Sequence, residues 1–178
     1  MDISRRNLMF GIGSCLVVPS LILSRGAEAS TYKADSRESL YRESNEIILA
    51  RMLFGEGRGV SVGERIAIGF TPINRFKNSE AKSLAEVILS PKQYSCFNFT
   101  PENPNLKKVL NPEKYNIKAW EKSLRISEAI LEGEYDYVNF GPTHYHRKDI
   151  KPKWVKLMTE KLDSKGFVHQ FYKGPFRT

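Results

Sequence analysis

The sequence predicts an α+β domain in which a helical half is followed by a small β-rich half. The first half holds two Ser-x-x-Glu motifs and an apolar segment over residues 47–54, both typical of helices. The last third instead carries short runs of aromatic, β-branched and histidine residues, which favour strands. The chain has 178 residues, 40% of them hydrophobic and 27% charged. This composition fits one globular domain and argues against a disordered tail, a collagen-like repeat and a multi-span membrane protein.

The first predicted helix covers residues 36–54. Its second half is apolar on nearly every side, which is typical of a helix buried at the centre of a domain. Three glycines within residues 55–59 follow it and permit a turn that a helix disfavours. We therefore expect the helix to end directly before residue 55.

Two further helices are predicted from serines that can cap a helix start. Ser61 and Ser83 each precede a glutamate by three residues, which is the capping-box pattern. The first of these helices runs to about residue 76, although Pro72 is expected to kink it or end it early. The second ends at Ser90, before Pro91.

The rest of the chain is predicted to form a long loop, a fourth helix and short strands. Four prolines within residues 91–115 indicate an irregular loop. Asn116 can cap a helix that carries Trp120 on an apolar stripe and ends at Gly133. Short strands are expected at Tyr135 and Tyr137, over 143–146 and over 167–172, with a brief helix over 153–162 between the last two.

Residues 1–29 have the features of a twin-arginine signal peptide. Arg5 and Arg6 precede an apolar run, and Ala27-Glu28-Ala29 forms a small-x-small cleavage site. The run is broken by glycine, serine and proline, whereas a bilayer-spanning helix needs about 20 apolar residues. We expect export to the periplasm or cell wall, cleavage of the signal and no stable membrane span afterwards; an uncleaved anchor is the alternative. Residues 30–44 are then a linker and the start of the first helix, and residues 45–173 are the main domain.

The charge of the chain favours an anionic partner. Lys and Arg number 28 against 20 Asp and Glu, which gives a formal charge of +8, and removal of the signal leaves +7. Nucleic acid, an anionic lipid surface and an anionic wall polymer all fit such a charge. Export argues against nucleic acid. The sequence shows no cofactor motif, and two cysteines, one of them in the signal, exclude a disulfide framework in the mature chain.

Glu56 is the first candidate for a catalytic group. It follows an apolar helix and stands between two glycines, so we expect its carboxyl group to be partly removed from water. Desolvation disfavours the ionised form of a carboxyl group, and a protonated carboxylic acid can act as a general acid. The structural alternative is a glutamate at a helix end that pairs with Arg58 or Arg51.

The histidines and one cysteine suggest other chemistry. His144 and His146 lie on one face of a predicted strand and could bind zinc, with His169 as a third ligand. The alternative is a set of polar or half-buried histidines on adjacent strands. Cys96 is a lone thiol that could serve as a nucleophile with a histidine or simply pack in the core.

An ordered series of motifs resembles the SleB-type cell wall hydrolases, a family first known from lysis of the spore cortex. Residues 49–59 resemble the family's A-R-x-x-x-G-E-A-R-G segment, with Gly57 in place of the usual alanine. Further similar segments occur at 67–69 and 73–75, at 90–95, at 143–146, at Pro152-x-Trp154 and at 166–172. The resemblance covers about residues 45–173, nearly the whole main domain.

The resemblance implies a lysozyme-like α+β domain that cleaves peptidoglycan, with Glu56 as its acid and base. It favours a lytic transglycosylase, because that reaction needs a single carboxyl group whereas classical glycosidases need two. Asp136 and Asp149 are the distant second candidates. Substrate contacts are expected from seven residues: Arg58, Asn74, Gln93, Tyr94, His144, Tyr145 and His146.

The resemblance also implies the partner, and two other functions stay open. We expect glycan strands as the partner, a monomer, and neither metal nor cofactor. One alternative is a zinc-dependent N-acetylmuramoyl-L-alanine amidase. The other is a peptidoglycan-binding protein with weak or no activity.

Overall fold

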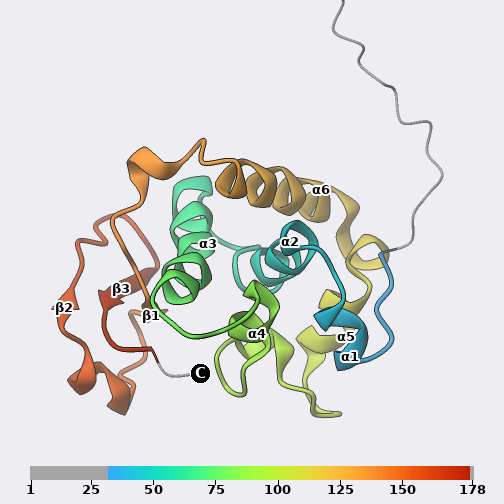
Figure 1. Cartoon of the computed structure of the whole chain (residues 1–178), viewed down its shortest axis with the longest axis horizontal. Helices are drawn as coiled ribbons and strands as arrows, with labels where there is room; N and C mark the ends of the chain where they lie inside the picture. The colour runs from blue at the N-terminus through green and yellow to red at the C-terminus, as the bar shows by residue number, and fades with distance from the viewer. Residues whose placement is uncertain (1–31, 177–178) are drawn as a thin grey trace, which may run out of the picture. The chain divides into compact units, whose positions relative to one another are not determined.

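The computed structural model describes residues 32–176, which form six α-helices and a three-stranded antiparallel sheet (Figure 1). The α+β class predicted from the sequence is confirmed. The helices are α1 (Arg37–Tyr41), α2 (Asn45–Glu56), α3 (Val62–Lys77), α4 (Leu84–Leu89), α5 (Pro104–Leu110) and α6 (Pro112–Leu131), and the strands are β1 (His144–Arg147), β2 (Glu160–Lys161) and β3 (His169–Lys173). Three 3₁₀ helices join them: η1 (Ser95–Phe97), η2 (Asp136–Val138) and η3 (Lys153–Leu157). The predicted signal peptide lies outside the described residues.

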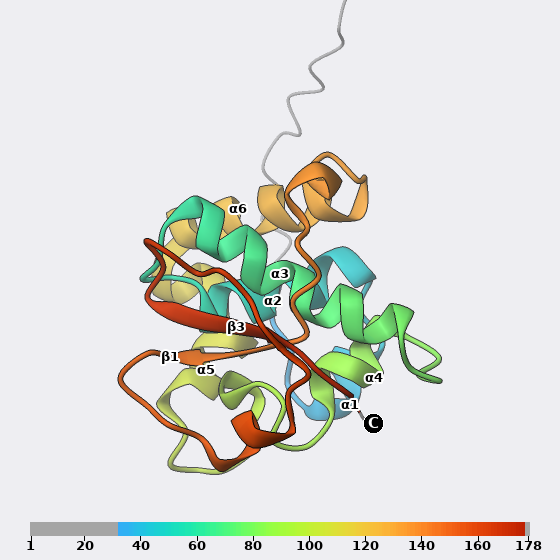
Figure 2. The same cartoon turned by 90° about the vertical axis from the view of Figure 1, so that its left-hand side faces the viewer.

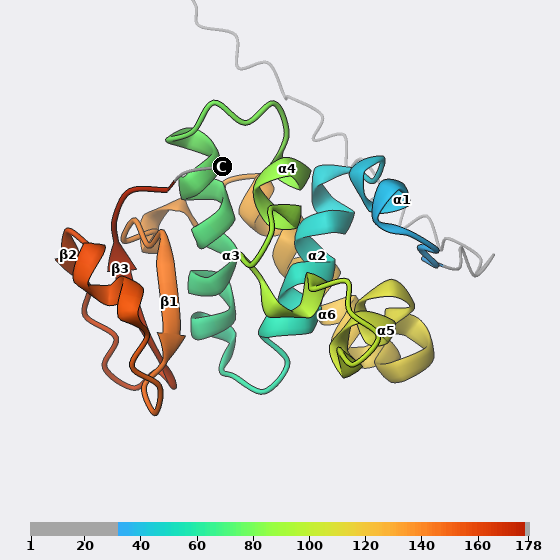
Figure 3. The same cartoon turned by 90° about the horizontal axis from the view of Figure 1, so that it is seen from below.

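Helix α2 is the centre of the domain, as its apolar sequence predicted. Every residue from Ile48 to Phe54 is buried. Trp120 of α6 packs edge-on against Phe54, and the Ser127 hydroxyl of α6 donates to the Glu46 carbonyl. Figures 1 and 3 show α2 enclosed by α3, α4 and α6, with the sheet on the far side of α3. None of the helices within residues 32–176 is both long and apolar enough to cross a membrane.

The predicted helix over 36–54 is two helices, and the second extends further than expected. Ser36 caps α1, and Ser44 starts α2 because its hydroxyl accepts a hydrogen bond from the N–H of Ile47 (3.3 Å). Helix α2 continues through Gly55 to Glu56. The candidate acid is thus the last residue of the helix rather than part of the turn.

Helix α3 runs through Pro72 without ending. A proline lacks the N–H that would bond to the carbonyl four residues earlier, here that of Ile68. The Thr71 hydroxyl donates to this carbonyl instead (2.7 Å). Because the neighbouring side chain replaces the missing donor, the helix reaches Lys77.

The segment predicted as an irregular loop contains ordered helical structure. Asn103 caps α5, and Pro104 occupies its first turn, where a missing N–H costs nothing. Asn116 lies at a kink within α6, and its side chain accepts from the N–H of Ala119 (3.0 Å), as expected of a cap. Two of the four prolines here, Pro104 and Pro112, start helices rather than exclude them.

The sheet has the order β1–β3–β2 and lies beside α3 (Figure 2). In the β1–β3 register, His144 pairs with Tyr172 and Tyr145 with Phe171. The strand predicted at Tyr135 and Tyr137 is wrong, since this segment forms η2. The helix predicted over 153–162 is short and is followed by β2.

Glu64 attaches the sheet to α3. This residue is only 1% exposed, and its carboxyl group accepts from the N–H groups of Val168 and His169 and contacts the His169 ring at 2.7 Å. The capping box predicted at Ser61 is therefore half correct. The Ser61 hydroxyl accepts from the N–H of Glu64, but the Glu64 side chain bonds to β3 rather than back to the cap.

Candidate active site around Glu56

The half-buried carboxyl group of Glu56 is hydrogen-bonded to two other parts of the fold. Oε1 accepts from the Ser95 hydroxyl (3.1 Å) and from the backbone N–H of Cys96 (3.0 Å), both on η1. Oε2 accepts a longer hydrogen bond from the Tyr145 hydroxyl on β1 (3.4 Å). The carboxyl group therefore lies where the central helix, η1 and the sheet meet.

Glu56 is not the arginine-paired helix end that was the structural alternative. Arg51 pairs with Glu43, with Nη2 2.6 Å from Oε1. Arg58 places its guanidinium 4.8 Å from the centre of the Phe54 ring. In the part of the chain that the structure describes, no ion pair involves Glu56.

Gly55 allows η1 to approach α2 closely enough for these bonds. A Cβ on Gly55 would lie 2.6 Å from the Cβ and Sγ of Cys96 and 2.8 Å from a methyl carbon of Val109. Ordinary contacts between carbon atoms are about 3.5–4.0 Å. The absence of a side chain at position 55 is what brings the Cys96 backbone within reach of Glu56.

Arg65 fixes the turn that follows the carboxyl group. Its side chain, almost fully buried, donates to the carbonyls of Gly57 (2.8 Å) and Arg58 (3.2 Å). A Cβ on Gly57 would lie 2.9 Å from Arg65 Cγ and from the Leu53 carbonyl oxygen. Glycine at position 57 therefore leaves room for the Arg65 side chain against the turn.

Two pockets adjoin the Glu56 region, each of about 640 Å³. Tyr145 lines the first and Ser95 lines the second, and both donate to Glu56. Lys92 lines both pockets, so they are neighbours. Its backbone has a φ of 64°, a left-handed conformation rare for a residue with a side chain. Glu56 itself lines neither pocket, and its carboxyl group adjoins them through its hydrogen bonds to Tyr145 and Ser95.

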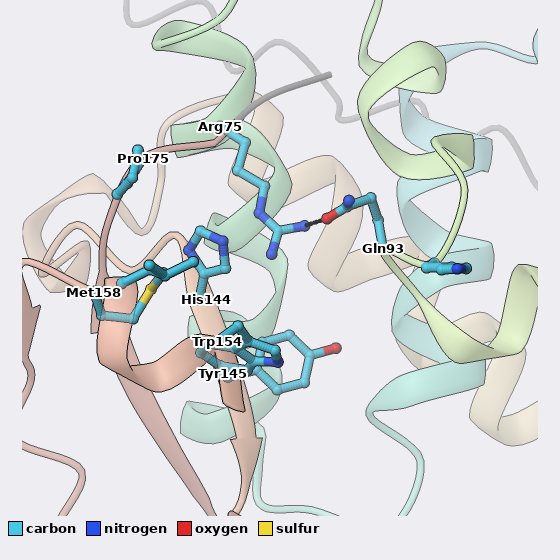
Figure 4. A pocket seen from close by; sticks show the side chains of 9 residues that line it. Arg75, Gln93, His144, Tyr145, Trp154, Met158 and Pro175 are labelled. Atoms are coloured by element: carbon cyan, nitrogen blue, oxygen red, sulfur yellow. Dashed lines mark hydrogen bonds between the residues drawn. The ribbon is translucent and has the colours of Figure 1, made fainter. Parts of the chain in front are cut away.

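The first pocket brings together several of the predicted substrate residues (Figure 4). Its lining comprises Arg75, Lys92, Gln93, His144, Tyr145, Trp154, Leu157, Met158 and Pro175. Arg75 reaches in from α3 and donates to Gln93 Oε1 at 3.2 Å. Desolvation, with a smaller contribution from the Arg75 charge, lowers the pKa of His144 from 6.5 to about 4. His144 is therefore neutral near pH 7.

The other four predicted contact residues line neither pocket. Tyr94 is buried in the core, where its hydroxyl is 3.0 Å from that of Thr71. Asn74 is also buried and donates to the Asn139 side chain and the Pro142 carbonyl, so it positions the segment before β1. His146 is stacked on Tyr172 and bonds to that residue's hydroxyl. Arg58 is half-buried and bonds to Asn105, which lines the second pocket.

The three histidines do not converge. Side chains alternate between the two faces of a strand, so His144 and His146 share one face of β1. His169 pairs with Arg147 and therefore lies on the other face, bonded to Glu64. Within residues 32–176 no cluster of three or more His, Cys, Asp or Glu side chains could hold a metal ion.

The Cys96 side chain packs in the core. It is fully buried, and burial raises its pKa well above the usual range, with the neighbouring Glu56 charge adding to the effect. The thiol therefore stays protonated near neutral pH, and a thiolate is what a cysteine nucleophile requires. What Cys96 contributes to the site is its backbone N–H.

The sequence pattern alone did not identify Ser95, Arg65 or Arg75 as parts of this site. Ser95 and Arg75 belong to motifs that carried the family resemblance, which was the signal that could have pointed to them. Searches against protein-family models, curated proteins and solved structures found no match for this chain.

Proposed function

We propose that this protein is an exported peptidoglycan-cleaving enzyme with a lysozyme-like domain, and that Glu56 is its catalytic acid and base. One observation carries the proposal: a half-buried carboxyl group, hydrogen-bonded by Ser95, Cys96 and Tyr145, stands beside two adjoining pockets. The motif series quoted above adds the substrate class. A glycan strand would occupy the two pockets, and the basic chain would attract anionic wall polymers.

The hydrogen bonds assign different roles to the two carboxyl oxygens. Oε1 already accepts from two donors, so its lone pairs are occupied. Oε2 has only the 3.4 Å contact with Tyr145 and is the oxygen that would carry the proton. Desolvation raises the pKa of Tyr145 well above its usual range, so its hydroxyl keeps its proton and orients Oε2.

The proposed reaction is that of a lytic transglycosylase. Glu56 donates its proton to the glycosidic oxygen as the bond to C1 of N-acetylmuramic acid breaks, releasing N-acetylglucosamine as the leaving group. The carboxylate then takes the proton from the 6-hydroxyl of the same muramic acid, whose oxygen bonds to C1. The product has a 1,6-anhydro ring, and no second carboxyl group is needed.

The candidates for a second carboxyl group favour this mechanism over hydrolysis. Asp149 is exposed and paired with Arg147, and Asp136 is exposed on η2. Glu102 is the one acidic residue in the lining of the two pockets within the described chain, and it lies on an exposed loop. A hydrolase would need such a group on the opposite side of the bond.

Mass spectrometry of muropeptides released from purified sacculi tests the proposal. We expect anhydro-muropeptides from the wild type, none from Glu56→Gln, and undiminished release from Glu102→Gln. Glutamine keeps the size and the acceptor oxygen of Glu56, and an unchanged melting temperature would show that the fold is intact. Release of anhydro products by Glu56→Gln would contradict the proposal. Reducing ends, with loss in Glu102→Gln, would indicate a hydrolase, whereas tight binding without products would indicate a binding protein.

A further inference from the structure

Arg75 is a buried cation without a carboxylate partner among residues 32–176. Its side chain is 4% exposed, yet no ion pair in that range includes it. Nε donates to the Thr143 carbonyl (2.5 Å) and Nη1 to Gln93 Oε1 (3.2 Å). A guanidinium group has five N–H donors, so three of them have no partner in the described part of the chain.

The packing around Arg75 holds its guanidinium group in place, and no acidic side chain within residues 32–176 pairs with it. The group lies 5.2 Å from the centre of the Tyr94 ring and 4.8 Å from that of Phe176. Figure 4 shows the guanidinium directed into the first pocket between Gln93 and His144. Aromatic faces and carbonyl oxygens orient an arginine, but they do not neutralise it as a carboxylate would.

The whole pocket has the character of an anion site. Of its nine lining residues, Arg75 and Lys92 are cationic and none is acidic. His144 is neutral near pH 7, in part because the Arg75 charge disfavours a second cation beside it. The planar fork of an arginine matches the two oxygens of a carboxylate, which it binds through two parallel hydrogen bonds.

We infer that the first pocket is a carboxylate subsite in which Arg75, assisted by Lys92, binds an acidic substituent of the muramic acid residue. The inference rests on the proposed function for the identity of the sugar. In peptidoglycan the lactyl group occurs on every second sugar, and it ends either in its own carboxylate or in a stem peptide that carries carboxylates. Tyr145 lines this pocket and also contacts Glu56, so a substituent bound here would bring its own sugar next to the acid.

The subsite would set the register of cleavage. A strand of alternating sugars can slide by one unit and present either kind of glycosidic bond to Glu56. N-acetylglucosamine has no group for Arg75, so only the register with muramic acid beside the pocket gains the charged contact. The selection then comes from leaving a buried arginine unpaired in the wrong register, an arrangement that discriminates strongly.

Gln93→Glu is the test variant, because it places a carboxylate next to Arg75 Nη1 at nearly unchanged size. The pocket would then hold its own anion. Asn45→Asp, at the exposed start of α2, is the matched control: it adds the same single charge far along the chain from the pocket residues. Binding is measured by calorimetry with N-acetylmuramic acid and with its neutral methyl ester. NMR of the Arg75 Nε–H reports the site directly, and the melting temperature of each variant shows that it is folded.

We expect the wild type and Asn45→Asp to bind the acid about tenfold more tightly than the ester, and Gln93→Glu to lose this preference. Equal binding of acid and ester by the wild type, or a preference that survives Gln93→Glu, would overturn the inference. N-acetylmuramoyl-L-alanyl-D-isoglutamine, whose carboxylate lies on the stem, distinguishes the source. Preference for the free acid identifies the lactyl carboxylate, and preference for the peptide identifies the stem. Because these ligands need no cleavage, failure of sacculus digestion would count against the proposed function alone.

Discussion

A methyl group added at Gly55 should disable the site with little loss of stability. In Gly55→Ala the new Cβ would lie 2.6 Å from the Cβ and Sγ of Cys96. Restoring an ordinary contact of about 3.5–4.0 Å requires η1 to move away by roughly 1 Å. The hydrogen bond from the Cys96 N–H to Glu56 Oε1 would lengthen from 3.0 Å to about 4 Å, beyond hydrogen-bond range.

The consequences for rate and stability differ in size. A misplacement of about 1 Å at a catalytic group costs on the order of 100-fold in rate. Overpacking costs about 1–3 kcal/mol, but replacing glycine by alanine inside a helix recovers up to about 1 kcal/mol. We therefore expect a net change in the free energy of unfolding of no more than about 2 kcal/mol, so that the variant remains folded.

The assay compares the rate of muropeptide release and the urea midpoint of Gly55→Ala with those of Gly63→Ala. Gly63 is also in a helix, but its added Cβ would meet only a Phe167 ring carbon at 4.0 Å. This control should keep both activity and stability. Adding Cys96→Gly to Gly55→Ala removes the two closest clashing atoms, leaving the Val109 methyl carbon at 2.8 Å, and should recover part of the rate. A Gly55→Ala protein that cleaves at the wild-type rate would refute the argument that close approach at this glycine positions Glu56.

Two further predictions concern the frame of the site. Thr71→Val removes the donor that replaces the Pro72 N–H at the Ile68 carbonyl, so we expect the free energy of unfolding, measured in urea, to fall by about 1–3 kcal/mol. Thr71→Ser keeps the hydroxyl and should stay near the wild type. Equal stability of the valine and serine variants would contradict this. Folding lowers the pKa of His144 from 6.5 to about 4, so between pH 6.5 and pH 4 the unfolded chain binds more protons than the folded chain. His144 therefore makes the free energy of unfolding fall as the pH drops through this range. His144→Gln should flatten the urea midpoint measured between pH 7 and pH 4.5, and an unchanged slope would exclude His144 as the cause.

Local signals in the sequence predicted the helices well because they act within a few residues. Ser61 and Ser83 cap α3 and α4 as expected, since a serine hydroxyl needs only the N–H three residues ahead. Helix α3 reaches Lys77, close to the predicted end at about residue 76, and does not end early at Pro72 because the Thr71 side chain replaces the missing donor. Pro104 misled the prediction: a proline at the first turn of a helix is favourable, but among four prolines it was taken as a sign of a loop.

The parts of the site that sequence analysis did not identify depend on contacts between distant segments. Glu56 stood out through its motif, yet two of its three donors are 39 and 40 residues away and the third is 89 residues away. Tyr94 was among the seven residues expected to contact substrate, but its hydroxyl is bonded to Thr71 of α3 in the core. Arg75 combines a charge that has no carboxylate partner among residues 32–176 with a place in the lining of a pocket, and this combination appears only once its neighbours are known.

The arrangement of donors makes α3 the element that aligns the site, although α3 contributes none of the atoms bonded to Glu56. At one end of the helix Glu64 holds β3 through two backbone N–H groups, and β3 pairs with β1, which carries Tyr145. At the other end Asn74 and Arg75 hold the carbonyls of residues 142 and 143, just before β1. The hydrogen bond to Oε2 of Glu56 therefore depends on how the sheet attaches to α3. The hydrogen bonds to Oε1 depend instead on the position of η1 within the helical half. Loss of the Glu64 contacts should weaken the orientation of Oε2, the proton-carrying oxygen, and leave the hydrogen bonds from Ser95 and Cys96 to Oε1 in place. A substitution at Glu64, more than a hundred residues from β3 in sequence, would then act on the chemistry through one carboxyl oxygen only.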